Sequence, residues 1–493
     1  MTTATRREWT GLAVIALPCL LYSMDLTVLN LAVPRLSADL HPSSAQLLWI
    51  VDIYGFLIAG SLITMGTLGD RIGRRRLLLI GAAAFGIASV VAAFSRTPEM
   101  LIASRALLGI AGATLAPSTL SLIRHMFHDP HQRTVAIGVW VTSYSVGGAI
   151  GPLIGGVLLQ YFWWGSVFLI GVPVMLLLLV LGPVLLPEYR IPDARRLDLL
   201  SAALSLVAVL AVIYGLKRIV QDGLRSPAAF SILSGLALGT TFVRRQRRLA
   251  DPLIDLRLFR SRAFSAALVL YLLGTFVVFG AYVFIAQYLQ LVLGLSPLQA
   301  GLATTPSMLG FVVGSFLVPR IARRFGPAFT MAGGLALAAA GFAVLTQVEK
   351  TSGVVIIIIA SILYSVGISP VVILATDLII GSAPVEGAGA ASALSETSSE
   401  LGGALGIAIL GSIGVAVYRA AMAQSVPIAR ATLGGAVAVA QELPAHLGVE
   451  LLATARGAFA HALELIAAIC AVIALLMVPL AMALPAKAQR LIA

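Results

Sequence analysis

Long apolar runs alternate with short polar segments along almost all of the 493 residues. A helix needs about 20 consecutive apolar residues to cross the hydrocarbon core of a lipid bilayer, and each run has roughly this length. The pattern therefore predicts an all-α membrane protein with 14 transmembrane helices. These helices are expected at residues 11–33, 47–67, 77–95, 101–123, 134–158, 164–186, 197–216, 227–243, 263–292, 298–318, 328–347, 353–382, 388–417 and 459–484.

The distribution of Lys and Arg tests this count, because cytoplasmic loops of membrane proteins carry an excess of both. With the N-terminus in the cytoplasm, the predicted cytoplasmic segments hold 23 Lys and Arg and the external segments hold nine. One missed helix would reverse the sides of all later loops and erase this difference. The sequence therefore predicts a multi-pass protein of the inner (cytoplasmic) membrane with both termini in the cytoplasm.

Composition excludes several other classes of protein. Hydrophobic residues make up 59% of the chain and charged residues 11%, whereas soluble domains average about 25% charged residues. No soluble basic domain carries the net charge of +12, so no nucleic-acid partner is expected. Cys19 and Cys470 lie in apolar runs, which excludes a disulfide framework. The first run contains Asp25 and no cleavage pattern follows it, so we expect a retained span and not a signal peptide.

Two segments recur at nearly the same spacing. Residues 142–156 and 397–411 are identical at eight of 15 positions at an offset of 255, and residues 71–73 resemble 324–326 at an offset of 253. These repeats predict two related six-helix bundles, helices 1–6 and 9–14, with helices 7 and 8 inserted between them. The predicted domains are 1–190, 191–262 with the basic loop, and 263–493.

The segment 420–458, between helices 13 and 14, is too long for a simple turn. It contains two stretches of helical composition, Leu433 to Leu443 and Leu447 to Ala458, on either side of Pro444. We expect a small extracellular helical hairpin here, with a disordered loop as the alternative.

The short segment between helices 2 and 3 concentrates charge and glycine. Its glycines permit a tight reversal, and an acid among arginines can form ion pairs that hold the two bundles together in one state and release them in another. We expect a gating loop made by Gly69, Asp70, Arg71, Gly73 and Arg74.

Helix 5 carries a row of small residues that allows close helix approach, and its proline adds a bend. These residues are Gly147, Gly151, Pro152, Gly155 and Gly156. Generic small-residue packing explains the row as well as a specific functional motif does.

Several charged residues lie within predicted spans. Arg105 on helix 4 needs an acidic or carbonyl partner inside the bundle, because an unpaired guanidinium there is costly. Asp25 and Asp52 lie on helices 1 and 2. Glu396 and Glu400 on helix 13 are one turn apart and so face one direction. Such carboxylates can exchange protons and offer a negative lining to a cation. A structural ion pair is one explanation of Arg105.

These motifs together resemble the major facilitator superfamily, in particular its fourteen-helix drug–proton antiporter branch, which includes quaternary-ammonium and methyl-viologen resistance pumps. The resemblance covers nearly the whole chain and is strongest at residues 48–54, 69–76 and 395–402. It implies substrate or proton handling by Asp25, Glu396 and Glu400, and a proton relay through Arg105. It also implies that the glycine row of helix 5 is an antiporter motif and that the protein is a monomer. Some members carry a further acid on helix 10, but residues 303–318 contain none, which argues against divalent cations.

Aromatic side chains in the spans offer faces for cation–π contact, although each alone is equally explained as core packing. The candidates that would line a substrate site are Tyr54, Trp140, Tyr144, Tyr282 and Tyr288.

The sequence hypothesis is an antiporter that exports lipophilic cations in exchange for protons, by rocking of the two bundles. Its partners are small lipophilic cations, protons and the bilayer; no cofactor, no metal and no enzymatic activity is expected. The alternatives are a same-fold exporter of a non-drug metabolite, lipid or siderophore, and a membrane receptor or regulator that transports nothing. No Walker motif is present, which disfavours an ATP-driven pump.

Overall fold

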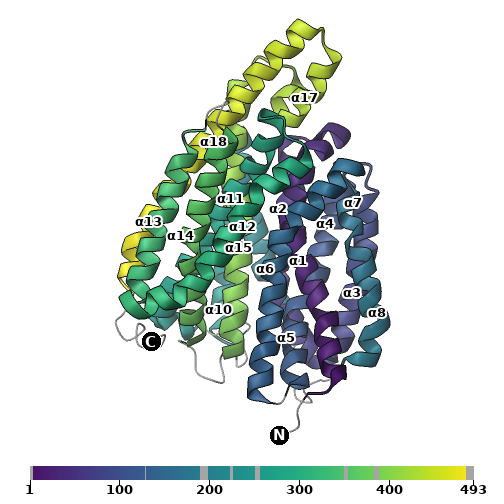
Figure 1. The fold of residues 1–493 in the computed structure, drawn as a ribbon, viewed down its shortest axis with the longest axis vertical. Coiled ribbons are helices and arrows are strands. Elements are labelled where there is room, and N and C mark those ends of the chain that lie inside the picture. Colours follow the sequence, from purple (N-terminus) through teal and green to yellow (C-terminus); the bar gives the residue numbers. More distant parts are fainter. Residues whose placement is uncertain are drawn as a thin grey trace.

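The structure, a computed structural model, describes residues 4–127, 129–188, 198–222, 226–249, 252, 256–348, 353–381 and 388–484. Within these ranges all regular secondary structure is helical, and the helices form one elongated bundle (Figure 1). The first part of the bundle contains α1 (Arg6–Leu40), α2 (Ser44–Ile72), α3 (Arg74–Ala93), α4 (Pro98–Gly112), α5 (Leu115–Met126), α6 (Pro130–Tyr161), α7 (Ser166–Leu169), α8 (Gly171–Leu185), α9 (Leu199–Asp222) and α10 (Ser226–Gln246).

The remaining elements begin with a short 3-10 turn and include one π-helical turn at the end of α11. They are η1 (Leu258–Arg260), α11 (Arg262–Gln287), η2 (Tyr288–Val292), α12 (Pro297–Phe325), α13 (Pro327–Leu345), α14 (Gly353–Gly381), α15 (Ala388–Ala421), α16 (Pro427–Ala431), α17 (Leu433–Glu442) and α18 (Ala445–Met482).

Twelve helices in the described ranges are long and apolar enough to span a membrane, so the chain is a multi-pass membrane protein. Two further helices cover the remaining predicted spans. The parts of α1 on either side of residue 26, Arg6–Asp25 and Thr27–Leu40, meet at a bend of 46°. In α9 the apolar part, Leu199–Gly215, is shorter than the other spans. The all-helical fold is confirmed, and the count of fourteen stays a prediction.

The repeated segments pack in equivalent ways. Helix α6 lies against α1 and α12, whereas α15 lies against α11 and α2. A Cβ added at Gly147 would collide with the backbone carbonyl of Leu20, and one added at Gly402 would collide with that of Leu272. The contact of Gly147 with Leu20 therefore corresponds to that of Gly402 with Leu272: the two glycines are 255 residues apart and the two leucines 252. This packing relates α1, α2 and α6 to α11, α12 and α15, while the predicted domain boundaries stay a prediction.

Helix α9 covers the line where α2 meets α15. Its Ile213 packs with Phe56 of α2 and Ala404 of α15 in one small apolar cluster. At the start of α9, Asp198 accepts a hydrogen bond from Arg245 at the end of α10, at 3.0 Å. The two predicted inserted helices therefore pack on each other and on the contact between α2 and α15.

The segment predicted as a hairpin folds into α16, α17 and the start of α18. The two helical stretches and the break at Pro444 agree with the prediction, but the expected boundary between the second stretch and the last span is wrong. Helix α18 runs without a break for 38 residues, a length of about 57 Å that exceeds a hydrocarbon core of about 30 Å. Its first turns and α17 therefore project beyond the rest of the bundle (Figure 1).

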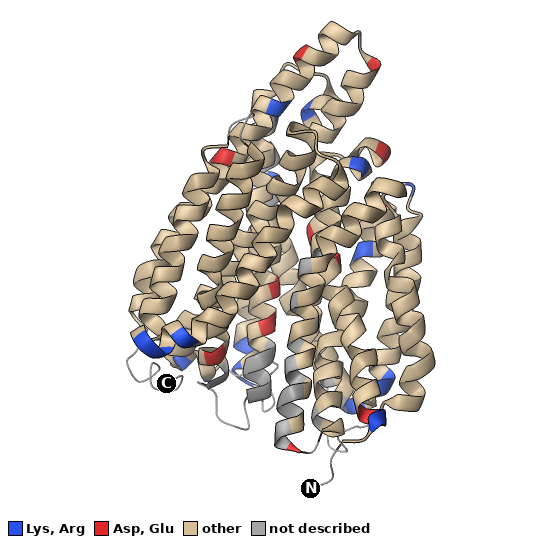
Figure 2. Cartoon of the chain, in the orientation of Figure 1, with Lys and Arg blue, Asp and Glu red and all other residues tan. Residues whose placement is uncertain are grey.

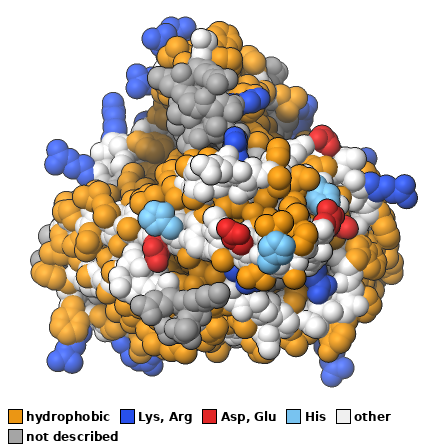
Figure 3. Space-filling model, turned by 90° about the horizontal axis from the view of Figure 1, so that it is seen from above, with side chains coloured by type: hydrophobic (Ala, Val, Ile, Leu, Met, Phe, Trp, Pro, Cys, Tyr) orange, Lys and Arg blue, Asp and Glu red, His pale blue; other side chains and the backbone are white. Residues whose placement is uncertain are grey.

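The projecting hairpin contacts α1 and α2, at the N-terminal end of the sequence. The Ser44 hydroxyl of α2 donates a hydrogen bond to the Ala431 carbonyl, and the hypothetical Cβ of Gly434 lies 2.8 Å from that of Ser37. Figure 3 views this end of the molecule and shows acidic and histidine side chains on its surface. Basic side chains gather at the opposite end, where α1 begins and α18 ends (Figure 2). The two ends of the bundle therefore differ in charge.

Candidate substrate and proton site

Glu400 of α15 lies at the contact between the two halves of the bundle. The Tyr22 hydroxyl of α1 donates a hydrogen bond to Glu400 Oε1 at 2.7 Å. Glu396, one turn earlier on α15, is also partly buried and makes no hydrogen bond within the described part of the chain. A carboxylate at this point is coupled to α1, so a change in its protonation or its ligand acts on both halves.

Arg105 of α4 has both kinds of partner that its burial requires. Its Nη1 lies 2.6 Å from Asp25 Oδ2, and its Nε donates a hydrogen bond to the Ile50 carbonyl at 3.2 Å. The Arg105 side chain is 1% exposed and the Asp25 side chain 13%. The guanidinium carbon also lies 4.4 Å from the centre of the Tyr54 ring, a cation–π distance. Asp25 is therefore held in a buried ion pair.

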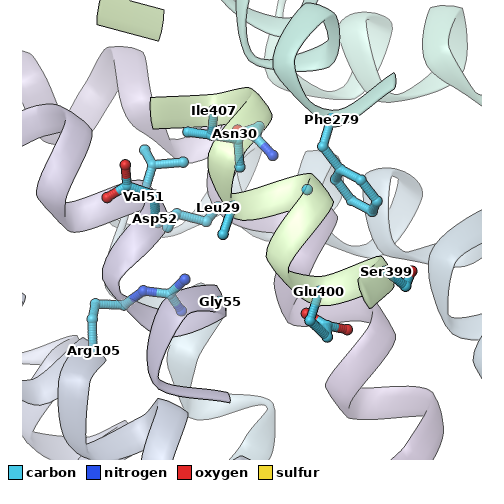
Figure 4. A pocket seen from close by; sticks show the side chains of 12 residues that line it. Leu29, Asn30, Val51, Asp52, Gly55, Arg105, Phe279, Ser399, Glu400 and Ile407 are labelled. Carbon is cyan, nitrogen blue, oxygen red and sulfur yellow. The ribbon is translucent and has the colours of Figure 1, made fainter. Parts of the chain in front are cut away.

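A small cavity of about 70 Å³ separates this ion pair from Glu400. Figure 4 shows Asp52 and Arg105 on one side and Glu400 and Ser399 on the other. Asp52 is only 1% exposed and is among the residues that line the cavity. The cavity therefore brings together three of the predicted acidic or basic residues, Asp52, Arg105 and Glu400, from α2, α4 and α15.

A larger cavity of about 240 Å³ adjoins the first, and Phe279 and Ser399 line both. The predicted residues Tyr144 and Tyr282 line it, from α6 and α11. Four helices of the second half and two of the first, α1 and α6, contribute to its wall. Sequence reasoning missed several of its residues, which are Tyr271, Phe279, Phe311 and Tyr364. Only their aromatic character on spans of the second half could have pointed to them.

Aromatic rings connect Glu400 to the first half of the bundle. The ring centre of Tyr22 lies 5.6 Å from that of Tyr144, which lies 4.8 Å from that of Trp140. The Tyr22 ring also lies 6.3 Å from Tyr54. Tyr22 was missed in the sequence, although its position one turn before Asp25 was a signal. The ring that carries the hydroxyl bound to Glu400 thus contacts Tyr54 and Tyr144, and Tyr144 in turn contacts Trp140.

One predicted aromatic residue lies elsewhere. Tyr288 is 1% exposed and lies in the π-helical turn η2, where it contacts the position of Gly353. It lines neither of the two cavities between the halves. The same holds for Tyr54 and Trp140, which adjoin the site only through their ring contacts, so a role of Tyr288 in substrate binding stays a prediction.

The predicted gating loop forms a tight link between α2 and α3. Gly73 has φ of 109°, a conformation that favours glycine, and closes α2 while starting α3. Arg74 is buried and donates to the Pro117 carbonyl at 3.3 Å, whereas Arg71 is exposed. The Asp70 side chain lies outside the described part of the structure, so its predicted ion pairs cannot be placed.

An acid from the end of α8 completes this loop. Glu188 lies 3.5 Å from Arg75, and a Cβ added at Gly73 would collide with the Glu188 carboxylate. Gly69, in turn, leaves room for the Arg74 side chain. Glu188 could not be found in the sequence, because more than 100 residues separate it from the loop.

The glycine row of α6 faces both halves of the molecule. Positions 151 and 155 leave no room for a side chain beside Thr27 and Val28 of α1. A Cβ added at Gly156 would lie 2.9 Å from the Cα of Leu298, and the Pro152 carbonyl occupies the space beside Gly301 of α12. The row therefore permits backbone-to-backbone contact of α6 with α1 and with α12.

Substituting Gly147 by Val should weaken this contact. The new side chain would meet the Leu20 carbonyl, so α6 and α1 must separate, at a cost of about 1–3 kcal/mol. Thermal unfolding of the purified protein should show a lower midpoint. Gly86→Ala on α3 is the control, because its Cβ would meet Met175 at an ordinary 3.6 Å. Equal midpoints for the two variants would contradict close packing at Gly147.

Residues 15–407, more than half of the chain, match the family described as Major Facilitator Superfamily. The chain belongs to the major facilitator superfamily. The resemblance that the sequence motifs indicated is therefore confirmed, and the helical bundle with two related sets of packed helices is the fold of a superfamily member.

Relatives within the superfamily include resistance pumps. The multidrug efflux pump LfrA of Mycolicibacterium smegmatis is 42% identical over 96% of this chain and 95% of its own length. The methyl viologen resistance protein SmvA of Salmonella typhimurium is 37% identical, over 92% and 93%. A solved structure of a bacterial homologue of the human lysosomal transporter Spinster matches with a TM-score of 0.69 and 20% identity over 99% of both chains, which shows the fold alone.

Proposed function

We propose that this superfamily member is a proton-coupled antiporter that exports lipophilic cations, such as quaternary ammonium compounds, cationic dyes and biocides. The observation that carries the proposal is the Glu400 carboxylate, bound to Tyr22 across the contact between the halves and flanked by aromatic rings. A negative group beside aromatic faces suits a lipophilic cation. The relatives LfrA and SmvA, named for multidrug efflux and methyl viologen resistance, support export and not catalysis.

The proposed cycle uses competition at Glu400. A cation bound there from the inner side contacts the carboxylate and the ring of Tyr22 or Tyr144. When the halves rock and the site opens outward, a proton from the exterior binds the Glu400 carboxylate and the cation leaves. Loss of the negative charge removes the main attraction for the cation, so one group couples both fluxes. Glu396, Asp52 and the Asp25–Arg105 pair serve the proton side of this exchange.

The proposed arrangement in the cell is a monomer with fourteen spans in the inner membrane. Both termini face the cytoplasm. The gathering of basic side chains at the end of the bundle where α1 begins and α18 ends supports this orientation (Figure 2). The hairpin of α16, α17 and the start of α18 then faces the exterior. Protons are the coupling ion, and no cofactor is required.

Proton release from everted vesicles tests this function. Adding ethidium to energised vesicles that contain the protein should release accumulated protons, and vesicles without the protein should not respond. Glu464→Gln should retain the response, because Glu464 lies on α18 with its side chain 39% exposed and contacts His461. No response from correctly inserted wild-type protein would contradict a cationic substrate.

A neutral aromatic metabolite is the second candidate substrate. The described residues that line the 240 Å³ cavity include tyrosines and apolar side chains and no acidic residue. A relative from Streptomyces glaucescens, 35% identical over 82% of this chain, is a tetracenomycin C resistance and export protein. Proton release with a neutral polyketide and none with ethidium would favour this candidate.

A further inference from the structure

An open groove lies on the second half of the bundle, away from the two central cavities. It has a volume of about 640 Å³, within the range of ligand pockets, and runs between α12, α13 and α14. Its rim is apolar and exposed: Leu317 is 44% exposed, Phe325 59% and Phe329 63%. Gly333 widens it, since a Cβ added there would contact nothing within 4 Å. In a bilayer, such a groove faces the acyl chains of lipids.

Three arginines lie at the end of α12 where this groove terminates. Arg324 lines the groove, and Arg320 lies one turn before it, on the same side of the helix. Arg323 lies between them, and all three are exposed. None has an acidic partner among the residues that the structure describes. The Arg324 guanidinium lies 5.4 Å from the Phe325 ring, which places a positive charge at the groove's rim.

Both halves carry arginines at this turn, but the internal repeat shows that the acids beside them differ. In the first half, Arg75 pairs with Glu188 beside the turn at Gly73. At the offset of 253, Gly73 corresponds to Gly326, which also has positive φ, and Asp70 corresponds to Arg323. An acid in one half is thus replaced by a base in the other. The excess positive charge at this turn of the second half has no counter-ion within the described chain.

We propose that this groove binds an anionic phospholipid of the surrounding leaflet. The phosphate would accept hydrogen bonds from Arg324 and its neighbours Arg320 and Arg323, and one acyl chain would lie along Leu317, Phe329 and Gly333. Guanidinium groups suit phosphate oxygens, and basic pockets between membrane helices suit anionic head groups. A zwitterionic lipid fits the apolar part but lacks the net negative charge that three unpaired arginines attract.

Lipid binding to the purified full-length protein tests the proposal. Native mass spectrometry with dioleoylphosphatidylglycerol and dioleoylphosphatidylcholine measures the retained lipid directly. The triple variant Arg320→Gln, Arg323→Gln, Arg324→Gln should lose at least about tenfold in affinity for the anionic lipid. The matched control replaces by Gln three exposed arginines at the end of α10, which are Arg244, Arg247 and Arg248. This control should change the affinity for the anionic lipid less than twofold. Equal losses in both triples would overturn the proposal in favour of general surface attraction.

A second variant tests the groove without changing charge. Gly333→Leu fills the groove and should weaken phosphatidylglycerol binding several-fold, whereas Gly457→Leu, at an equally open position on α18, should not. Unchanged lipid binding by Gly333→Leu would overturn the assignment of the acyl chain. If that variant instead raised only the KM for exported dye, the groove would be a substrate route and not a lipid site.

Discussion

Replacing Glu400 by Gln should reduce dye-driven proton release from everted vesicles by about 100-fold or more. The amide cannot take up and release a proton, and it carries no negative charge to attract a cation, so both halves of the exchange fail. The substitution keeps the size of the side chain and leaves the Tyr22 hydroxyl an oxygen to which it can donate. Normal insertion with lost exchange is therefore the expected result.

Two neighbouring variants sharpen this experiment. Tyr22→Phe removes a hydrogen bond to a carboxylate, worth about 1.5–3 kcal/mol, and should raise the apparent KM for dye at least about tenfold while exchange continues. Glu396→Gln should have a smaller effect than Glu400→Gln, because Glu396 makes no hydrogen bond across the contact between the halves among the described residues. Exchange at wild-type rates by Glu400→Gln would remove this residue from the coupling mechanism.

Replacing Arg105 by Met should destabilise the protein by about 3–5 kcal/mol. The change leaves the Asp25 carboxylate and the Ile50 carbonyl without their buried donor. Combining it with Asp25→Asn removes the uncompensated charge and should restore most of the stability. Because a neutral pair cannot relay a proton, the double variant should still fail in proton release. Denaturant unfolding of the purified proteins and the vesicle assay measure the two effects separately.

The control for the buried Arg105–Asp25 ion pair is the more exposed Arg–Asp ion pair between α9 and α10. Arg245 and Asp198 lie 3.0 Å apart, with side chains 36% and 15% exposed. Arg245→Met should cost about 1 kcal/mol or less, because water screens such pairs. A similar loss for Arg105→Met would contradict the buried pairing of Arg105 with Asp25.

Sequence patterns predicted the helices well where the bilayer imposes their length. The spans, the inserted pair and the break at Pro444 follow from local composition. Each predicted span lies on one helix of the structure or, at 101–123 and 164–186, on two consecutive helices. The boundary before residue 459 was wrong for a physical reason. Charged residues such as Arg456 end an apolar run, but they do not end a helix that has already left the hydrocarbon core.

Partners between helices were harder to predict than the helices themselves. The spacing along α15 placed Glu396 and Glu400 on one face, and the burial of Arg105 required a partner. The choice of Asp25 over Asp52 as the direct ion-pair partner at 2.6 Å depends on how α1, α2 and α4 approach one another. Such distances follow from packing between helices, which no single segment encodes. Tyr22 and Glu188 were missed for the same reason.

The length of α18 has a practical consequence on the proposed topology. Its first turns, with α16 and α17, form a small folded body that stands clear of the lipid and rests on Ser37 and Ser44. An antibody fragment raised against this body would reach it from outside an energised cell, after passing any outer layer of the envelope. Because the body touches both halves, a rigid binder across it would hold the exporter in one state without having to enter the cytoplasm.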